Sequence, residues 1–106
     1  MVSLNKENFE EEVLKSDLPV LVDFWGPQCQ PCLALIPFVE ALAAKQGGSL
    51  KVAKVDAPGN RRLCLNLKVM GLPTFLLYRH GEEIGRLTGN GITSESLSQW
   101  IDKILG

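Results

Sequence analysis

Residues 25–32 read WGPQCQPC and place two cysteines, Cys29 and Cys32, three positions apart. Residues 20–25 are apolar apart from Asp23 and rich in β-branched and aromatic side chains, which predicts a buried central strand. After the cysteines, apolar side chains recur at spacings of three and four, which predicts a helix. The two cysteines therefore lie where a helix begins after a strand.

The same periodicities predict the rest of the secondary structure. The helix after the cysteines is expected to run towards Gly47 and Gly48 and to be kinked at Pro37, because proline lacks an N–H and crowds the preceding turn. The other predicted elements are, in chain order, a helix over 5–15 with an Asn5 cap, a strand over 50–56, a short helix capped by Asn60, strands over 74–79 and 83–88, and a final helix capped by Thr93 or Ser94.

The order of these elements predicts the fold class. The strand over 20–25, the helix and the strand over 50–56 should form a right-handed parallel crossover. The strands over 74–79 and 83–88 should form an antiparallel hairpin about the turn at residues 80–81. We therefore expect an α/β fold with a central mixed β-sheet flanked by helices on both faces.

Composition and charge limit the possible functions. A length of 106 residues suits one domain over residues 1–106. The net charge of -1 gives no basic field for nucleic acid. The chain lacks an apolar run of about 20 residues and a secretory signal, so we expect no membrane association and a cytoplasmic location. The odd count of 3 cysteines favours a redox or metal role over a framework of structural disulfides.

The spacing of Cys29 and Cys32 suits a disulfide that opens and closes. In a first helical turn their Cα atoms lie about 5 Å apart, within the range that a disulfide needs. A disulfide that closes so short a loop stabilises a fold by only about 2 kcal/mol in the chain-entropy model. The bond is therefore better suited to opening and closing in a redox reaction than to stabilising the fold. Cys29, at the positive end of the helix, is expected to be the nucleophile, and Cys32, in the apolar stripe, the shielded resolving thiol. Pro31 rigidifies the spacer between them.

Several matches, in order along the chain, resemble the thioredoxin family. Residues 22–25 resemble the strand that enters the active site in that family. Cys-Gln-Pro-Cys at residues 29–32, followed by Pro37, resembles its redox motif and kinked helix, and Gly-Leu-Pro-Thr at residues 71–74 resembles the segment that holds its cis proline. Further matches in family order are Gly81, Gly89 and the final amphipathic helix. The resemblance covers nearly the whole chain.

The resemblance implies a thiol-disulfide oxidoreductase that reduces protein disulfides. Its redox centre would be the disulfide between Cys29 and Cys32, with no bound cofactor and no metal. The implied partners are disulfide-containing proteins and a thioredoxin-reductase-like electron donor, and the implied oligomeric state is a monomer. The resemblance also implies that the Leu72–Pro73 bond is cis and that Pro73 packs beside the cysteines, where its backbone pairs with an extended substrate strand.

Asp23 is the candidate proton carrier of this site. It shares a strand face with Leu21 and Trp25, so we expect it to be buried, and burial raises the pKa of a carboxyl towards the range useful for proton exchange with Cys32. A hydrogen-bonded core acid is the alternative interpretation. The resemblance implies Lys54 as the charged partner of Asp23. The substrate-binding residues that it implies are Trp25, Gln28, Gln30, Pro31, Leu72, Thr88 and Gly89.

Two residues beside the cysteines depart from the family pattern. Gln28 stands where thioredoxins usually have Trp, and Gln30 stands where they usually have Gly. A flexible amide thus replaces a flat apolar contact, and a side chain is added next to the reactive sulfur. These changes leave the reduction potential and the choice of partner open.

Three other functions remain open at this point. The protein would oxidise or isomerise disulfides if its chemistry ran in the other direction, or it would be a redox-inert interaction domain. It would be a zinc-binding module if Cys29, Cys32, Cys64 and His80 formed a site, although a second paired spacing is lacking. We expect instead that Cys64 is a buried small hydrophobe and that His80 is an exposed turn residue.

Overall fold

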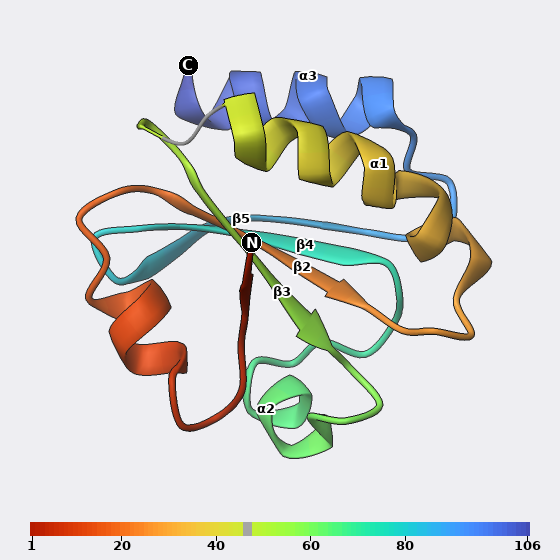
Figure 1. The fold of residues 1–106 in the computed structure, drawn as a ribbon, viewed down its shortest axis with the longest axis horizontal. Coiled ribbons are helices and arrows are strands. Elements are labelled where there is room, and N and C mark those ends of the chain that lie inside the picture. The colour runs from red at the N-terminus through yellow and green to blue at the C-terminus, as the bar shows by residue number, and fades with distance from the viewer. Residues whose placement is uncertain (46–47) are drawn as a thin grey trace.

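The computed structural model describes residues 1–45 and 48–106, and within them five strands form one sheet with helices on both faces (Figure 1). The elements are β1 (Val2–Ser3), η1 (Glu10–Leu14), β2 (Val20–Trp25), α1 (Gln30–Lys45), β3 (Lys51–Asp56), α2 (Arg61–Asn66), β4 (Thr74–Arg79), β5 (Glu82–Thr88) and α3 (Ser94–Leu105). None of the helices in these two ranges is long and apolar enough to cross a membrane.

The sheet is mixed and has the strand order β1-β3-β2-β4-β5. β2 runs parallel to β3 and antiparallel to β4, and β4 forms an antiparallel hairpin with β5. The parallel strand-helix-strand unit and the closing hairpin are therefore both confirmed. β2 lies in the middle of the sheet, so its carboxyl end carries the loop to Cys29 out of the most enclosed part of the fold.

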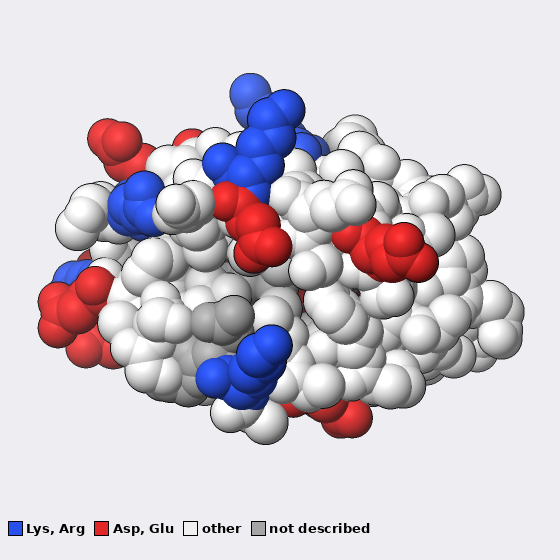
Figure 2. Space-filling model, turned by 90° about the horizontal axis from the view of Figure 1, so that it is seen from above, with Lys and Arg blue, Asp and Glu red and all other residues white. Residues whose placement is uncertain are grey.

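Successive side chains of each strand point to opposite faces of the sheet and so belong to two separate cores. Leu21, Phe75 and Leu77 pack with residues of α1 and α3 on one face of the sheet. Val22 and Phe24 pack with residues of η1 and α2 on the other face. Figure 1 shows α1 and α3 side by side above the sheet and α2 below it. The predicted α/β sandwich is thus confirmed. On the molecular face seen from above, Figure 2 shows basic and acidic side chains interspersed.

The regular helix predicted over 5–15 is wrong in its geometry. The Oδ1 of Asn5 accepts hydrogen bonds from the N–H groups of Glu7 and Asn8, as a cap would, but the helix itself begins later, with Phe9 at its N-cap. The chain then widens into the π-helix η1, in which the N–H of Lys15 donates to the carbonyl of Glu10. Phe9, just before η1, packs edge-on against Tyr78. Such tertiary contacts outweigh the local preference for a regular helix.

Three other local predictions have mixed outcomes. Asn60 is at the N-cap of α2, but its side chain makes no cap bond there and donates instead to the carbonyl of Asp56. Thr93 is the cap of α3 and forms a reciprocal capping box with Ser96. Pro37 lies inside α1, while the predicted end of that helix at Gly47 falls outside the described residues. The two-residue strand β1 is too short to show periodicity in the sequence.

We expect the substitution Leu97→Ala to lower the free energy of unfolding by about 2–5 kcal/mol. Leu97 is 0% exposed and packs α3 on the sheet, so truncation leaves a cavity. The matched control is Leu65→Ala on α2, where the side chain is 63% exposed and the expected loss is below about 0.5 kcal/mol. Urea unfolding measures both. Equal losses in the two variants would contradict this description of the core.

Candidate redox site

Cys29 and Cys32 form a disulfide at the beginning of α1, with their Cα atoms 5.3 Å apart. Cys29 directly precedes the helix, and its carbonyl accepts the N–H of Leu33 at 3.0 Å. Its sulfur accepts the N–H of Cys32 at 3.3 Å. The sulfur thus takes the place that a Ser, Thr or Asp oxygen takes at an ordinary N-cap. The predicted ability of this pair to close is confirmed.

The two sulfur-bearing residues differ in exposure. Cys32 is 2% exposed and belongs to the buried face of α1, whereas Cys29 is half-buried. Gln28 and Gln30, the two residues that depart from the thioredoxin pattern, are both exposed on either side of Cys29. A partner that approaches the disulfide from solvent therefore meets Cys29 and the two glutamines before it meets Cys32.

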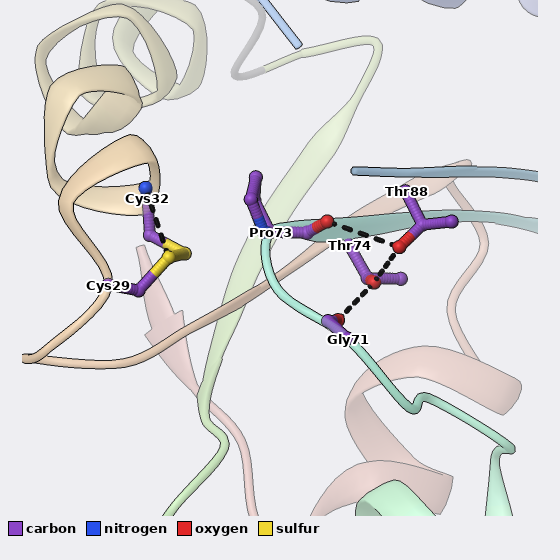
Figure 3. The surroundings of a disulfide bond; sticks show 6 residues. All are labelled: Cys29, Cys32, Gly71, Pro73, Thr74 and Thr88. Carbon is purple, nitrogen blue, oxygen red and sulfur yellow. Dashed lines mark hydrogen bonds between the residues drawn. A yellow bond between two sulfur atoms is a disulfide. The ribbon is translucent and has the colours of Figure 1, made fainter. Parts of the chain in front are cut away.

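The segment that contains Pro73 faces the disulfide. The Leu72–Pro73 bond is cis, as the resemblance implies. Figure 3 shows the sulfur atoms pointing towards Pro73. A Cβ placed on Gly26 would lie 3.3 Å from the Cδ1 of Leu72, so glycine allows the active-site loop and the proline segment to approach closely. Gly89 also contacts the proline segment, since its N–H donates to the carbonyl of Pro73 at 3.1 Å.

Asp23 is buried beneath α1, as predicted, and is 4% exposed. It lies next to Lys54 in the register between β2 and β3. Burial raises its pKa from the ordinary 3.8 to about 7, while the positive charge of Lys54 opposes part of that rise. Its Oδ1 has no hydrogen-bond partner among the described residues, so the alternative of a hydrogen-bonded core acid is not supported.

A small cavity of about 130 Å³ connects these groups. Asp23, Trp25 and Lys54 line it together with Ile36 of α1, which lies one turn beyond Cys32. The indole N–H of Trp25 is buried and, among the described residues, lacks a hydrogen-bond partner. The Nζ of Lys54 lies 5.9 Å from the centre of the Trp25 ring. Trp25 thus forms a wall of the cavity at Asp23.

The zinc alternative is wrong. Cys29 and Cys32 are bonded to each other, and Cys64 is a buried free thiol in the core on the opposite face of the sheet from α1. His80 is exposed in the turn between β4 and β5. Across residues 1–45 and 48–106, no three His, Cys, Asp or Glu side chains gather into a group that would hold a metal. The predictions for Cys64 and His80 are confirmed, and burial raises the pKa of the Cys64 thiol.

Two surface hollows, one beside the proline loop and one beside the first turn of α1, were not predicted. One, of about 490 Å³, is largely apolar and is lined by Leu65, Met70 and Leu72, with Met70 84% exposed. The other, of about 610 Å³, has Gln30 and Pro31 on one side and Asn90 on the other. A signal for the first exists in the sequence, because Leu65 and Met70 fall outside the apolar stripe of the short helix. Asn90 carries no comparable signal.

Comparison with known proteins places the chain among a class of enzymes that exchange disulfides. The thioredoxin family model matches residues 1–103. A thioredoxin of Peptoclostridium acidaminophilum is 39% identical over the whole of this chain and 96% of its own length. A thioredoxin of Acetoanaerobium sticklandii is 37% identical over 99% of this chain and 100% of its own length. Thioredoxin 1 of Nostoc is 36% identical over 92% of this chain and 90% of its own length.

The closed cysteine pair, the mixed sheet and these relatives agree. The protein is a dithiol-disulfide oxidoreductase with the Cys29–Cys32 pair as its redox centre. The chain belongs to the thioredoxin family and is a protein-disulfide reductase. Neither the oxidising or isomerising direction nor the redox-inert alternative is favoured, since the matched relatives are thioredoxins and both cysteines are present.

We expect Asp23→Asn to stabilise the protein at neutral and alkaline pH. Between about pH 4 and pH 7 the folded protein keeps a proton on Asp23 that the unfolded chain has released, so stability falls as pH rises. With about 1.4 kcal/mol for each pH unit, the penalty reaches about 4 kcal/mol above pH 7. Urea unfolding should therefore give the variant a gain of about this size at pH 8 and little gain at pH 4. A gain that does not vary with pH would contradict the burial argument.

Proposed function

We propose that reduction of a protein disulfide begins at Cys29 and ends at Cys32. In the reduced protein the Cys29 thiolate attacks one sulfur of the substrate disulfide. A bond forms between Cys29 and that sulfur, and the other substrate sulfur leaves as a thiolate and takes up a proton. Cys32 then loses its proton and attacks Cys29, which releases the second substrate thiolate. The products are a substrate dithiol and the Cys29–Cys32 disulfide.

The observation that carries this division of roles is the N-cap position of the Cys29 sulfur. It accepts the N–H of Cys32 at 3.3 Å, and the same amide is available to a thiolate after reduction. The positive end of the α1 dipole adds to this stabilisation. Cys29 is also the more exposed of the pair, whereas Cys32 at 2% exposure suits an intramolecular attack.

Asp23 is the group that takes the proton from Cys32. A pKa of about 7 leaves both forms of the carboxyl populated near neutral pH, so Asp23 can accept a proton and return it. The cavity that it shares with Trp25 and Lys54 is polar enough and large enough for water to carry that proton. Lys54 holds the pKa of Asp23 below the value that burial alone would give.

An extended segment of the substrate binds across the exposed edge formed by the proline loop. Leu72 offers a backbone N–H and carbonyl with no hydrogen-bond partner among the described residues, which suits pairing with a strand. The side chains around this edge that contact substrate are those of Trp25, Gln28, Gln30 and Pro31, with Pro73 and the backbones of Thr88 and Gly89 beside them. The two hollows along this edge give room for the neighbouring substrate residues.

The partners of this reaction are proteins that contain accessible disulfides and a thioredoxin-reductase-like donor. The donor returns two electrons and two protons to the Cys29–Cys32 disulfide, so no other redox cofactor takes part. We propose that residues 1–106 act as one domain, as a monomer, in the cytoplasm. The thioredoxins to which the chain is similar over nearly their full length support this setting.

We expect Cys29→Ser to abolish reduction of insulin with dithiothreitol as the donor, because the attacking thiolate is lost. Cys32→Ser should attack the substrate but fail to release it, so that a mixed disulfide accumulates. Mass spectrometry under non-reducing conditions identifies the adduct and the cysteine that carries it.

The control is Cys64→Ser, which changes a buried free thiol of the core on the opposite face of the sheet from α1, at the floor of the apolar hollow. It should keep the activity of the parent. An adduct carried by Cys64, or a Cys29→Ser variant that retains turnover, would overturn the assigned roles.

A further inference from the structure

We propose that the hydroxyl pair of Thr74 and Thr88 positions the proline loop so that the backbone of Leu72 faces the substrate. This role rests on the proposed function, because it concerns how the substrate segment is presented to Cys29. Neither hydroxyl reacts. Both are positioning groups that act through the carbonyls of the loop.

Three hydroxyl contacts, drawn in Figure 3, and one backbone hydrogen bond tie the loop to the hairpin. The hydroxyl of Thr74 donates to the carbonyl of Gly71 at 2.6 Å, and the hydroxyls of Thr74 and Thr88 lie 2.7 Å apart. The hydroxyl of Thr88 also lies 3.3 Å from the carbonyl of Pro73, which accepts the N–H of Gly89 at 3.1 Å as well. The loop is thus held at the carbonyls of both Gly71 and Pro73.

The protons of the two hydroxyls can be assigned. Each threonine has one hydroxyl proton, and that of Thr74 goes to the carbonyl of Gly71. Thr88 is therefore the donor available to the oxygen of Thr74, and its one proton is shared between that oxygen at 2.7 Å and the carbonyl of Pro73 at 3.3 Å. Thr74 is almost fully buried, so loss of the Thr88 hydroxyl would leave a buried oxygen without its donor.

The consequence for binding lies in the residue between the two held carbonyls. The carbonyls of Gly71 and Pro73 are occupied by the chain itself. Leu72 has no backbone hydrogen bond among the described residues. A strand that pairs with one residue of an edge needs both the N–H and the carbonyl of that residue. The hydroxyl pair therefore holds the loop on both sides of Leu72, the residue before Pro73, whose own N–H and carbonyl are left to recognise an extended substrate.

The test is Thr88→Val, which keeps the branched shape and removes the hydroxyl. Reduction of insulin measures activity on a polypeptide substrate that must pair with the loop. Reduction of hydroxyethyl disulfide measures the reactivity of the cysteines, because this small molecule contacts little of the protein apart from them. We expect KM for insulin to rise roughly fivefold, the effect of losing one hydrogen bond, with kcat retained. The ratio of kcat/KM for insulin to kcat/KM for hydroxyethyl disulfide should fall by the same factor. Thr88→Ser, which restores the hydroxyl, should restore the ratio.

The matched control is Ser16→Ala. This substitution also removes a hydroxyl that makes two hydrogen bonds, here to the backbone of Leu18. It should lower thermal stability without changing the ratio. If Thr88→Val fails to fold, Thr88→Ala provides the same comparison.

Two results would overturn the positioning role. In one, Thr88→Val keeps the parent ratio; in the other, Thr88→Ser behaves like Thr88→Val. A parent protein that reduces neither disulfide would instead refute the proposed function, and the positioning role with it. The three results are distinguishable from the same set of assays.

Discussion

The hydrogen bond from the N–H of Cys32 to the sulfur of Cys29 is the contact on which the rest of the site depends. It places a sulfur at the cap of α1, where unpaired amides and the helix dipole favour negative charge. The same turn brings the two Cα atoms to 5.3 Å, so the partner thiol is within reach without a change of backbone. The central strand β2 supplies this geometry, because it delivers the chain from the core directly to the start of α1.

Burial of Asp23 lowers the stability of the folded protein but places a carboxyl group near the cysteines. A carboxyl at 4% exposure with an unpaired oxygen destabilises the folded state whenever it is ionised. The compensation is partial and comes from the positive charge of Lys54. An apolar residue at this position of β2 would suit the surrounding core better, which makes a functional role for the acid the simplest reason for its presence.

Much of the fold and of the site followed from the sequence, and the failures have physical causes. The strand over 20–25 was predictable because its side chains are apolar on both faces. The helix after Cys29 was predictable because its apolar side chains form one stripe. The π-helix was not, because contacts with Tyr78 and the sheet decide its geometry. The Thr74–Thr88 pair was not predictable either. A regular hairpin about residues 80–81 would place Thr74 opposite Leu87, and the register shift at Leu77 and Tyr78 brings Thr88 there instead.

The most direct test of the account compares the reactivity of the three cysteines in the reduced, folded protein. Brief treatment with iodoacetamide at neutral pH, followed by mass spectrometry of the peptides, gives the rate at each thiol. We expect Cys29 to be alkylated first, because it is more exposed than Cys32 and its sulfur lies at the cap of α1, while Cys32 and Cys64 are protected by burial. Equal rates at Cys29 and Cys32, or faster alkylation of Cys32, would contradict the claim that the cap of α1 activates the outer sulfur.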